Sequence, residues 1–251
     1  MQVRFEWNNA SWQVDLEKGQ DISIPLIPGK MTPNCFYAPF FDARPVRSGD
    51  FVGSLKEGGP VNFKNLTINP HGNGTHTECV GHILDGPYTI NKSLQKFHFT
   101  GELISVFPTL MPNGDRVITE ESLQLLGLVY PVELLIIRTL PNPPEKPNFT
   151  YSGNNPAYFE PAAIQLINDW GVKHLITDLP SVDREVDEGK LTAHHTFWNT
   201  NASPSEEKTI TELVFVPDDI KDGLYMVNIH IISLETDASP SKIVLYDMHN
   251  A

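Results

Sequence analysis

The sequence has few cysteines, few basic residues and no long apolar run, and each shortage excludes a class of protein. Two cysteines among 251 residues cannot form the disulfide framework of a small secreted domain. Eighteen lysines and arginines against 31 acidic residues give a net charge of −13, which leaves no basic face for nucleic acid. No apolar run approaches the roughly 20 residues that cross a bilayer. We therefore expect neither a nucleic-acid partner nor a membrane partner.

The sequence also lacks a linker, a block of like charge and an internal repeat, so a single domain over residues 1–251 is expected. With 40% hydrophobic residues, the chain can bury a core of that size. Residues 1–7 show no basic segment followed by an apolar run, and so no secretion signal. We expect a cytoplasmic protein in a reducing compartment.

The second half of the chain contains a strand pattern, a helix pattern and another strand pattern in direct succession. Residues 132–138 form a continuous apolar run of strand length. Pro161 suits the first turn of a helix with an apolar face, which Gly171 ends, and residues 172–178 form another apolar run. This order predicts a crossover unit with parallel strands, which is typical of α/β proteins.

Shorter patterns indicate the other elements. Residues 1–70 are rich in proline, glycine, asparagine and aromatic residues, which indicates short strands and loops. The Pro-rich loop over residues 140–153 is long for a compact domain, so we expect a lid or binding loop over a pocket. A short helix is expected over residues 191–199, and further strands over residues 209–216, 224–232 and 243–246.

The densest group of metal-ligand side chains lies in residues 71–82. His71, His76 and His82 share this stretch with Glu78, and two glycines allow the backbone to turn tightly. His76 and Glu78 are two residues apart, so in an extended segment both side chains leave on the same face. Imidazole and carboxylate groups are ligands of zinc and manganese, so the pattern indicates a metal site. The alternative is a loop whose histidines bind backbone groups and one another.

A second group of such residues lies far downstream. His194 and His195 are adjacent, and on a helix they point about 100° apart, so one of them is expected to face a shared site. Glu212 interrupts an apolar strand, which is unfavourable unless its charge is paired or metal-bound. We interpret Glu212 as a metal ligand, with an edge-strand or solvent-facing residue as the alternative.

Several residues near these groups are candidates for supporting roles. Asp178 and Asp183 flank a loop at the end of an apolar strand, where α/β sheets place functional residues. Either acid could orient a ligand histidine, and either could equally belong to an ordinary turn. Cys79 is interpreted as a packing residue beside the metal. The candidates for an apolar pocket, with ordinary core positions as the alternative, are Phe36, Tyr37, Phe40, Phe41 and Trp198.

The order of these motifs resembles that of a known group, the cyclase family of metal-dependent hydrolases, which includes bacterial kynurenine formamidase and isatin hydrolase. The family motif is His-x-Gly-Thr-His-x-Asp-x-x-x-His, and residues 74–82 read Gly-Thr-His-Thr-Glu-Cys-Val-Gly-His. Gly72 occupies the position of the family's first histidine, with His71 one residue earlier, and Glu78 replaces the family's aspartate. The resemblance continues in order through residues 135–139, 178–183, 193–195, 210–213 and 222–225.

The resemblance implies a ligand set and a fold. His76, Glu78, His194 and Glu212 would surround one ion, and His71, Glu78 and His82 would surround a second. His194, rather than His195, matches the family position. The cofactor would be one or two Zn²⁺ ions, with Mn²⁺ as the alternative. The family fold is a swivelling β/β/α domain, an α/β architecture with a mixed sheet and crossover helices, usually in homodimers.

The resemblance also implies an amide hydrolase similar to arylformamidase, which converts N-formylkynurenine to kynurenine and formate in tryptophan catabolism. In the expected mechanism a metal-bound water attacks the carbonyl of a small, aryl amide substrate. His194 and Glu212 are the expected catalytic residues, and His194, if it is not fully committed to the metal, passes a proton to the leaving nitrogen. The alternatives are hydrolysis of isatin or another cyclic amide or lactone, and a metal-containing protein that binds a small ligand without turnover.

Overall fold

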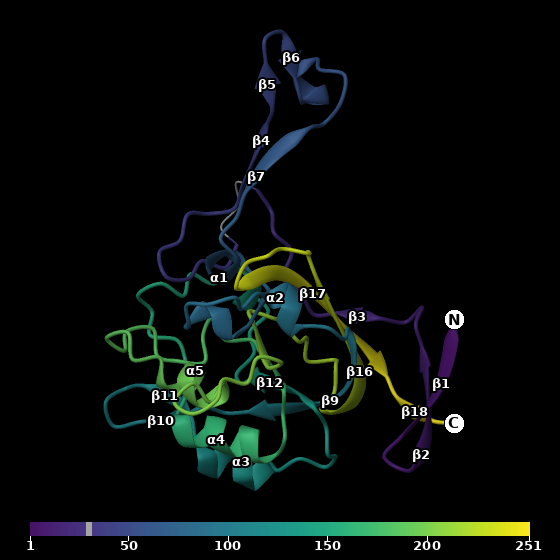
Figure 1. Ribbon diagram of the computed structural model, residues 1–251, viewed down its shortest axis with the longest axis vertical. Helices are drawn as coiled ribbons and strands as arrows, with labels where there is room; N and C mark the ends of the chain where they lie inside the picture. The colour runs from purple at the N-terminus through teal and green to yellow at the C-terminus, as the bar shows by residue number, and fades with distance from the viewer. Residues whose placement is uncertain (29–31) are drawn as a thin grey trace.

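The computed structural model describes residues 1–28 and 32–251. Its central feature is a mixed sheet that curls so that strands from its two ends pair with each other. The eight strands of this sheet follow the order β16, β9, β12, β14, β15, β8, β17 and β3, and β17 also pairs with β16 (Figure 1). Their bounds are β3 Gln20–Asp21, β8 His76–Glu78, β9 His98–Val106, β12 Leu134–Thr139, β14 His174–Thr177, β15 Thr209–Glu212, β16 Gly223–Ile231 and β17 Ala238–Asp247.

Helical crossovers build the parallel part of the sheet. β12 pairs in parallel with both β9 and β14, and β14 pairs in parallel with β15. The helices between these strands are α3 (Glu120–Leu126), α4 (Pro161–Asp169) and α5 (Thr192–Phe197), which lie against one another on one side of the sheet (Figure 1). The predicted α/β class, with a mixed sheet and crossover helices, is confirmed.

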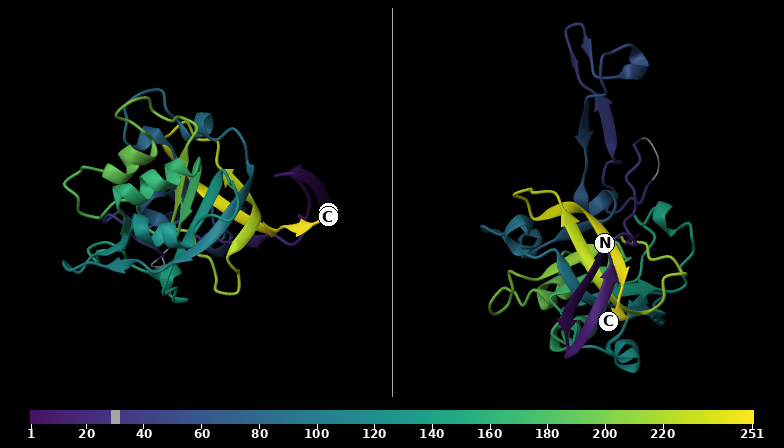
Figure 2. Two further views of the ribbon diagram at one scale, coloured as in Figure 1. Left: turned by 90° about the horizontal axis from the view of Figure 1, so that it is seen from below. Right: turned by 90° about the vertical axis from the view of Figure 1, so that its right-hand side faces the viewer.

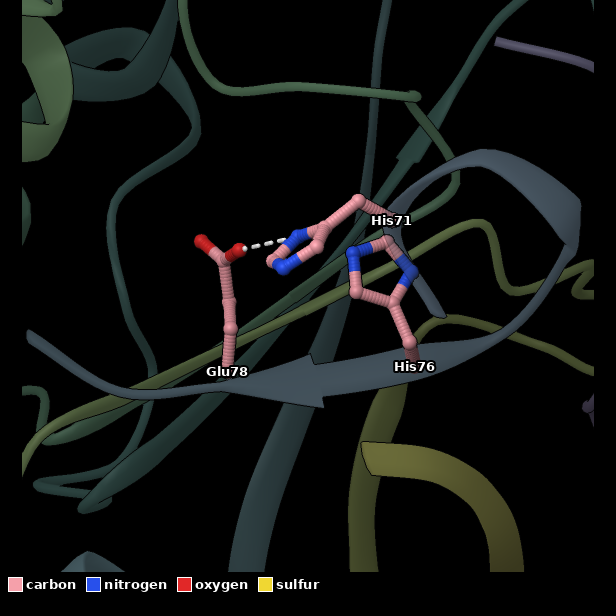
Figure 3. A group of neighbouring side chains, drawn as sticks. All are labelled: His71, His76 and Glu78. Atoms are coloured by element: carbon pink, nitrogen blue, oxygen red, sulfur yellow. Dashed lines mark ion pairs between the residues drawn. The ribbon is translucent and has the colours of Figure 1, made fainter. Parts of the chain in front are cut away.

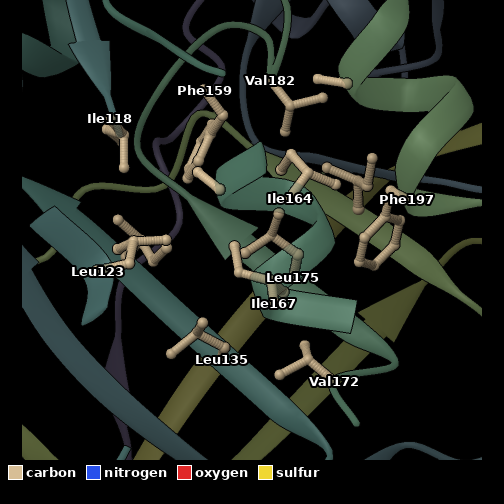
Figure 4. Packing of buried hydrophobic residues seen from close by; sticks show 14 of the residues in the cluster. Ile118, Leu123, Leu135, Phe159, Ile164, Ile167, Val172, Leu175, Val182 and Phe197 are labelled. Carbon is tan, nitrogen blue, oxygen red and sulfur yellow. The ribbon is translucent and has the colours of Figure 1, made fainter. Parts of the chain in front are cut away.

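Two apolar cores cover the two faces of the central strands. The first fills the space between sheet and helices, where Leu135 and Leu175 face Ile164, Ile167 and Phe197 (Figure 4). Because both faces are covered, the central strands read as continuous apolar runs rather than as alternating ones. Each fully buried Leu, Ile or Phe contributes about 1.5–3 kcal/mol, so these cores hold the strands in register. Members of the second core, inside the curled sheet, include Leu103, Ile136, Ile176, Val227 and Ile243.

Two groups of short strands project from this body. β1 (Gln2–Trp7), β2 (Ala10–Asp15) and β18 (His249–Asn250) form a small sheet that places both termini close together (Figure 1). Residues 42–67 form an arm that extends away from the rest of the chain (Figures 1 and 2). The arm contains the pairs β4 (Asp42–Pro45) with β7 (Lys64–Thr67) and β5 (Arg47–Ser48) with β6 (Phe51–Val52). Over the described residues, the prediction of short strands and loops up to residue 70 is confirmed.

The remaining elements are short. They are β10 (Thr109–Leu110), β11 (Arg116–Ile118), β13 (Tyr158–Phe159), α1 (Pro70–Asn73) and α2 (Ile90–Ser93), with 3₁₀ turns at Leu55–Glu57, Val80–His82 and Lys146–Asn148. Within residues 1–28 and 32–251, no helix combines the length and the apolar composition that crossing a membrane requires.

Several element boundaries differ from those the sequence predicts. The strand expected over residues 209–216 ends at Glu212, because Leu213 adopts a left-handed φ of 57° that breaks the extended backbone. The strand expected over residues 243–246 is longer and begins at Ala238, and the helix expected over residues 191–199 is limited to α5. The sequence pattern does not predict β9, because Gly101 and Glu102 interrupt its apolar residues.

The Pro-rich loop over residues 140–153 lines a cavity of about 480 Å³. Lys146, Phe149 and Tyr151 are among its lining residues, and none of the predicted metal ligands is. The predicted pocket is therefore present beside this loop but is separate from the histidine cluster. The lid or binding role of the loop stays a prediction.

Candidate metal centre

β8 carries two of the predicted ligands and lies between β15 and β17. In the β8–β15 register, His76 lies opposite Glu212. Opposite residues of an antiparallel pair share a face, and so do residues two apart on one strand. His76, Glu78 and Glu212 therefore point to one side of the sheet. Thr77 points to the other side, where its hydroxyl lies 2.8 Å from that of Thr211.

Four side chains form a buried part of the cluster, which we call the inner half: His76, Glu212, His194 and Asp183. His76 Nε2 lies 3.4 Å from Glu212 Oε2, and His194 Nδ1 lies 2.6 Å from Asp183 Oδ2. The Asp183 carboxylate also accepts the backbone N–H groups of Ala193 and His194 at 2.8 and 3.0 Å. These contacts tie the first turn of α5 to the loop that follows β14 and orient the His194 ring.

Three side chains that are more exposed than those of the inner half form what we call the outer half: His71, His82 and Asp237. His71 lies on α1, whose first turn is capped by the Asn69 side chain, and His82 lies on the turn Val80–His82. Asp237 Oδ2 lies 2.9 Å from His71 Nε2 and 3.4 Å from His82 Nδ1. The two imidazole rings stack, with centroids 4.2 Å apart.

Glu78 joins the two halves. Its Oε1 lies 3.2 Å from His194 Nε2, and its Oε2 lies 3.0 Å from His71 Nδ1, the ion pair drawn in Figure 3. Glu78 Oε2 is also 3.9 Å from His82 Nε2. One buried carboxylate thus faces imidazoles from both halves. The structure brings the six predicted ligands into one cluster: His71, His76, Glu78, His82, His194 and Glu212. Glu212 reaches it through His76 and, among the described residues, belongs to none of the donor groups whose atoms all lie within 4.8 Å of one another.

The one-residue displacement of the first histidine has a steric reason. A Cβ at position 72 would lie 2.2 Å from the Cβ of Ala38, so glycine is required there. His71, one residue earlier on α1, directs its ring toward Glu78 instead (Figure 3). Although Gly72 replaces the histidine of the family motif, His71 therefore supplies an imidazole to the cluster.

The structure distinguishes the two adjacent histidines on α5. His194 is buried and faces Glu78, whereas His195 Nδ1 lies 2.5 Å from the Thr200 hydroxyl. Cys79 is fully buried in the core inside the curled sheet, in agreement with a packing role.

The two candidate supporting acids have different partners. Asp183 binds His194, as described above. Asp178 instead accepts the Thr139 N–H at 2.8 Å and lies 2.6 Å from Lys146 Nζ. Asp178 is therefore part of a buried ion pair beside the Pro-rich loop and does not orient a histidine of the cluster.

Asp237 belongs to the cluster although the local sequence offers no signal for it. The residue follows Glu235 and Thr236 in a polar turn between β16 and β17, a common setting for a surface acid. It reaches the cluster because β17 pairs with β8, and its backbone carbonyl accepts the Cys79 N–H at 3.0 Å. A pairing between strands about 160 residues apart cannot be read from spacing along the chain.

The charges of the cluster shift its pKa values. Burial lowers the pKa of His194, but the carboxylates of Asp183 and Glu78 outweigh burial and raise this pKa to about 10. Burial acts in the same way on His71, where Asp237 and Glu78 raise the pKa to about 10. Burial raises the pKa of Glu78, yet the surrounding imidazoles hold it well below its ordinary value. Protons on the imidazoles thus compensate the carboxylates, a role that a bound cation would take over.

The atoms that face the centre of the cluster fit a divalent cation. His76 Nε2 and Glu78 Oε2 are buried without an aligned hydrogen-bond partner among the described residues, a situation that costs about 1–3 kcal/mol per group. Glu78 Oε2 is close to His71 Nδ1 but not aligned with it, as expected where both atoms face a third position. Overlapping groups of three side chains each offer ligand atoms that all lie within 4.8 Å of one another. These groups are His71, His76 and Glu78; His71, His82 and Asp237; and Glu78, His82 and His194. Imidazole nitrogen and carboxylate oxygen suit zinc or manganese.

A cavity of about 230 Å³ opens at the cluster. Four of the predicted ligands line it: His71, His82, His194 and Glu212. Its other walls come from Phe36, Ser181, Arg184, Glu185, Asp187 and Leu191. The cavity therefore places a small molecule in contact with both halves of the cluster.

The aromatic pocket candidates occupy different environments. Phe36 lines the cavity at the cluster. Trp198 is fully buried in the core, with its ring centroid 5.5 Å from that of His194. Tyr37 and Phe40 are exposed, and Phe41 is buried outside the cavity lining. The core interpretation is therefore correct for Trp198 and Phe41, whereas an apolar contact of Phe36 with an aryl substrate stays a prediction.

The sequence matches a protein-family model over about two thirds of its length. The model of the Cyclase family, described as putative cyclase, matches residues 15–184. No curated protein matches the sequence.

Comparison with solved structures gives matches over most of the chain. A potential metal-dependent hydrolase with cyclase activity is 18% identical, with 92% of this chain and 98% of that chain covered and a TM-score of 0.66. A predicted metal-dependent hydrolase from Bacillus stearothermophilus is 17% identical, with coverages of 92% and 98% and a TM-score of 0.64. Isatin hydrolase A from Ralstonia solanacearum is 14% identical, with coverages of 91% and 91% and a TM-score of 0.67. The expected family fold is confirmed.

Proposed function

We propose, from the premise that this chain belongs to the Cyclase family of putative cyclases, that it is a metal-dependent hydrolase of a small amide. One observation carries the proposal. His76 Nε2 and Glu78 Oε2 are buried without an aligned hydrogen-bond partner in the described structure, although Glu212 Oε2 and His71 Nδ1 lie 3.4 and 3.0 Å away from them. Both atoms lie inside a cluster of imidazoles and carboxylates that borders a cavity. Such an arrangement is unfavourable for the fold alone and favourable for holding a cation.

The proposed cofactor is zinc, with one or two ions, and manganese is the second candidate. The ligands proposed for the first ion are His76, Glu78, His194 and Glu212, and those for the second are His71, Glu78 and His82. A divalent cation in this position would polarise a substrate carbonyl and acidify a water molecule.

The chain's own residues supply orientation and proton transfer. The Asp183 carboxylate holds Nδ1–H of His194, so the Nε2 of this ring faces Glu78 and the cavity. If its Nε2 is not bound to the cation, His194 can pass a proton from this position to the leaving nitrogen of an amide, and Asp183 stabilises the charged imidazole. Glu212 is held by the Val182 N–H, which its Oε1 accepts at 3.0 Å, so its Oε2 stays directed at His76.

The proposed substrate is an aryl formamide of the N-formylkynurenine type. Phe36 and Leu191 offer apolar contacts to one aromatic ring, and the 230 Å³ cavity accommodates a single-ring molecule. A cyclic aryl amide of the isatin type is the second candidate, because it also presents a carbonyl beside an aromatic ring. A metal-containing protein that binds such a ligand without turnover is the candidate from another class.

Metal analysis combined with a substrate panel tests this proposal. The protein is stripped with a chelator, reloaded with zinc or manganese, and assayed with N-formylkynurenine, isatin and a simple aryl formamide. We expect hydrolysis of at least one amide by the reloaded protein and none by the stripped one. Turnover that survives stripping would contradict metal dependence, and full metal occupancy without turnover on the panel would favour the binding protein.

We also propose that the protein forms a homodimer through the arm. Large apolar side chains of the arm are 49–64% exposed, an unfavourable surface for a free projection. These side chains are Leu55, Val61, Phe63 and Leu66. Light scattering after gel filtration should give a dimer mass for the wild type and a monomer mass for the double variant Leu55→Asn, Leu66→Asn. A monomeric wild type would contradict the proposal.

A further inference from the structure

The outer half contains a carboxylate, that of Asp237, which is not among the six predicted metal ligands. Asp237 Oδ2 accepts from His71 Nε2 at 2.9 Å and lies 3.4 Å from His82 Nδ1. The two rings stack with an interplanar angle of 25°, so one oxygen atom serves both. Both contacts are on the sides of the rings that face away from Glu78.

We propose that Asp237 is a positioning residue that sets the tautomers of His71 and His82 and so prepares the second metal position. This inference rests on the proposed metal-dependent function. An ionised carboxylate can accept hydrogen bonds but cannot donate them, so each nitrogen facing Asp237 carries a proton. In a neutral imidazole the opposite nitrogen is then bare. The bare atoms are His71 Nδ1 and His82 Nε2, which lie 3.0 and 3.9 Å from Glu78 Oε2.

The inner half shows the same arrangement independently. His194 Nδ1 faces Asp183 Oδ2 at 2.6 Å, which leaves Nε2 facing Glu78. His76 Nδ1 faces the Gly74 carbonyl at 2.9 Å, which leaves Nε2 buried and unpartnered in the described structure. When the rings are neutral, as metal binding requires, all four would therefore have an outer acceptor and a bare inner nitrogen, the pattern of metal-ligating histidines.

The position of Asp237 is fixed by the sheet. Its neighbour Ala238 pairs with Glu78 in the β8–β17 register, and its own carbonyl accepts the Cys79 N–H at 3.0 Å. The carboxylate is thus tied to the strand that carries the shared ligand. The displaced His71 presents Nδ1 inward, whereas the other three rings present Nε2. With Asp237 as the hydrogen-bond acceptor of Nε2–H, the displaced His71 ring can bind a metal ion through Nδ1.

The test compares zinc binding by the full-length wild type, Asp237→Ala, Asp237→Glu and Glu235→Gln. Glu235 lies two residues away and binds Thr89 and Asn91 outside the cluster, so its variant is the matched control. Stripped protein is titrated with zinc by calorimetry, and ¹⁵N shifts of the imidazoles identify the coordinating nitrogens. We expect Asp237→Ala to weaken the second zinc ion about 10–100-fold and to leave the first unchanged. Asp237→Glu should restore part of the affinity, and Glu235→Gln should match the wild type.

In the zinc-loaded wild type, the nitrogen shifts should show His71 coordinating through Nδ1 with the proton on Nε2. Unchanged zinc affinity in Asp237→Ala, or coordination of His71 through Nε2, would overturn the proposal. Complete loss of the second ion in Asp237→Ala without any recovery in Asp237→Glu would also overturn it, in favour of a direct ligand. Because zinc binding is measured apart from turnover, absent hydrolysis with the expected affinities would refute the proposed function and leave this inference standing.

Discussion

The inner and outer halves use the same chemistry in different surroundings. The side chains of His76 and His194 are 0% and 2% exposed, whereas those of His71, His82 and Asp237 are 22%, 29% and 38% exposed. The inner half is positioned by sheet register and α5, and the outer half by a one-turn helix and two turns. Electrostatic interactions are stronger where water is excluded, so the inner half should bind its ion more tightly. The same exclusion makes its substitutions more damaging.

The largest effect is expected at Glu78, because both halves depend on it. Glu78→Ala removes the carboxylate that lies within 3.2 Å of His194 and 3.0 Å of His71. We expect loss of both metal ions and a fall of hydrolysis to the level of stripped protein. Elemental analysis and a turnover assay measure these quantities. A variant that retains two ions would show that the halves bind independently of Glu78.

The next effect separates the two halves directly. Glu212→Gln removes a buried charge of the inner half, and His82→Ala removes a ligand of the outer half. We expect turnover to fall by more than about 100-fold in Glu212→Gln, beyond the usual range for supporting residues, and by less in His82→Ala. Steady-state kinetics at saturating zinc measure both. Equal losses, or a larger loss in His82→Ala, would remove the distinction between the halves.

A smaller effect compares the two carboxylates that hold imidazoles. Asp183 is 5% exposed and accepts two backbone N–H groups besides His194, whereas Asp237 is 38% exposed. In stripped protein, Asp183→Asn should lower the free energy of unfolding by about 1–3 kcal/mol. Asp237→Asn should lower it by less than about 1 kcal/mol, because the solvent screens its charge. Urea unfolding at neutral pH measures both, and the reverse order would contradict the comparison.

The last effect concerns His174, a buried histidine outside the cluster, and it appears only when the pH is changed. Burial, followed by the nearby charges of Lys173 and Lys96, lowers the pKa of His174 to about 3. In the described structure its Nδ1 lies 2.9 Å from the neutral Thr209 hydroxyl. Its folded pKa lies below the unfolded value, so its contribution to stability is present above about pH 6.5 and is lost as the pH falls. Between pH 7 and pH 5 the wild type should lose about 2 kcal/mol more than His174→Gln. Urea unfolding at both pH values measures this difference, and parallel losses would show that His174 does not titrate as described.

The parts of the fold that sequence predicts are those encoded locally. The apolar runs of β12 and β14 and the proline-initiated α4 appear as predicted, because both faces of these strands are buried and the helix carries its own end signals. β9 is not predicted because Gly101 interrupts its apolar residues. A Cβ at this position would lie 2.6 Å from the Leu134 side chain, and this contact between distant residues cannot be read from the local sequence. The arm is likewise absent from the local patterns, since its strands are two to four residues long.

The site divides in the same way. The i, i+2 spacing of His76 and Glu78 and the charge of Glu212 in an apolar strand are local signals, and the structure places these residues together. Asp237 depends on the pairing of β17 with β8, which no local spacing encodes. The displaced His71 depends on a close approach of Gly72 to Ala38 that the sequence does not show. The positions of Asp237 and His71 therefore could not be predicted from the sequence, because one depends on the pairing of distant strands and the other on the tight contact at Gly72.

The existence of a metal centre at this cluster is tested by calorimetric titration of the stripped wild-type protein with zinc. We expect two binding events, a tighter one for the inner half and a weaker one for the outer half. Absence of any binding below millimolar zinc, in a protein that remains folded, would contradict a metal centre at this cluster.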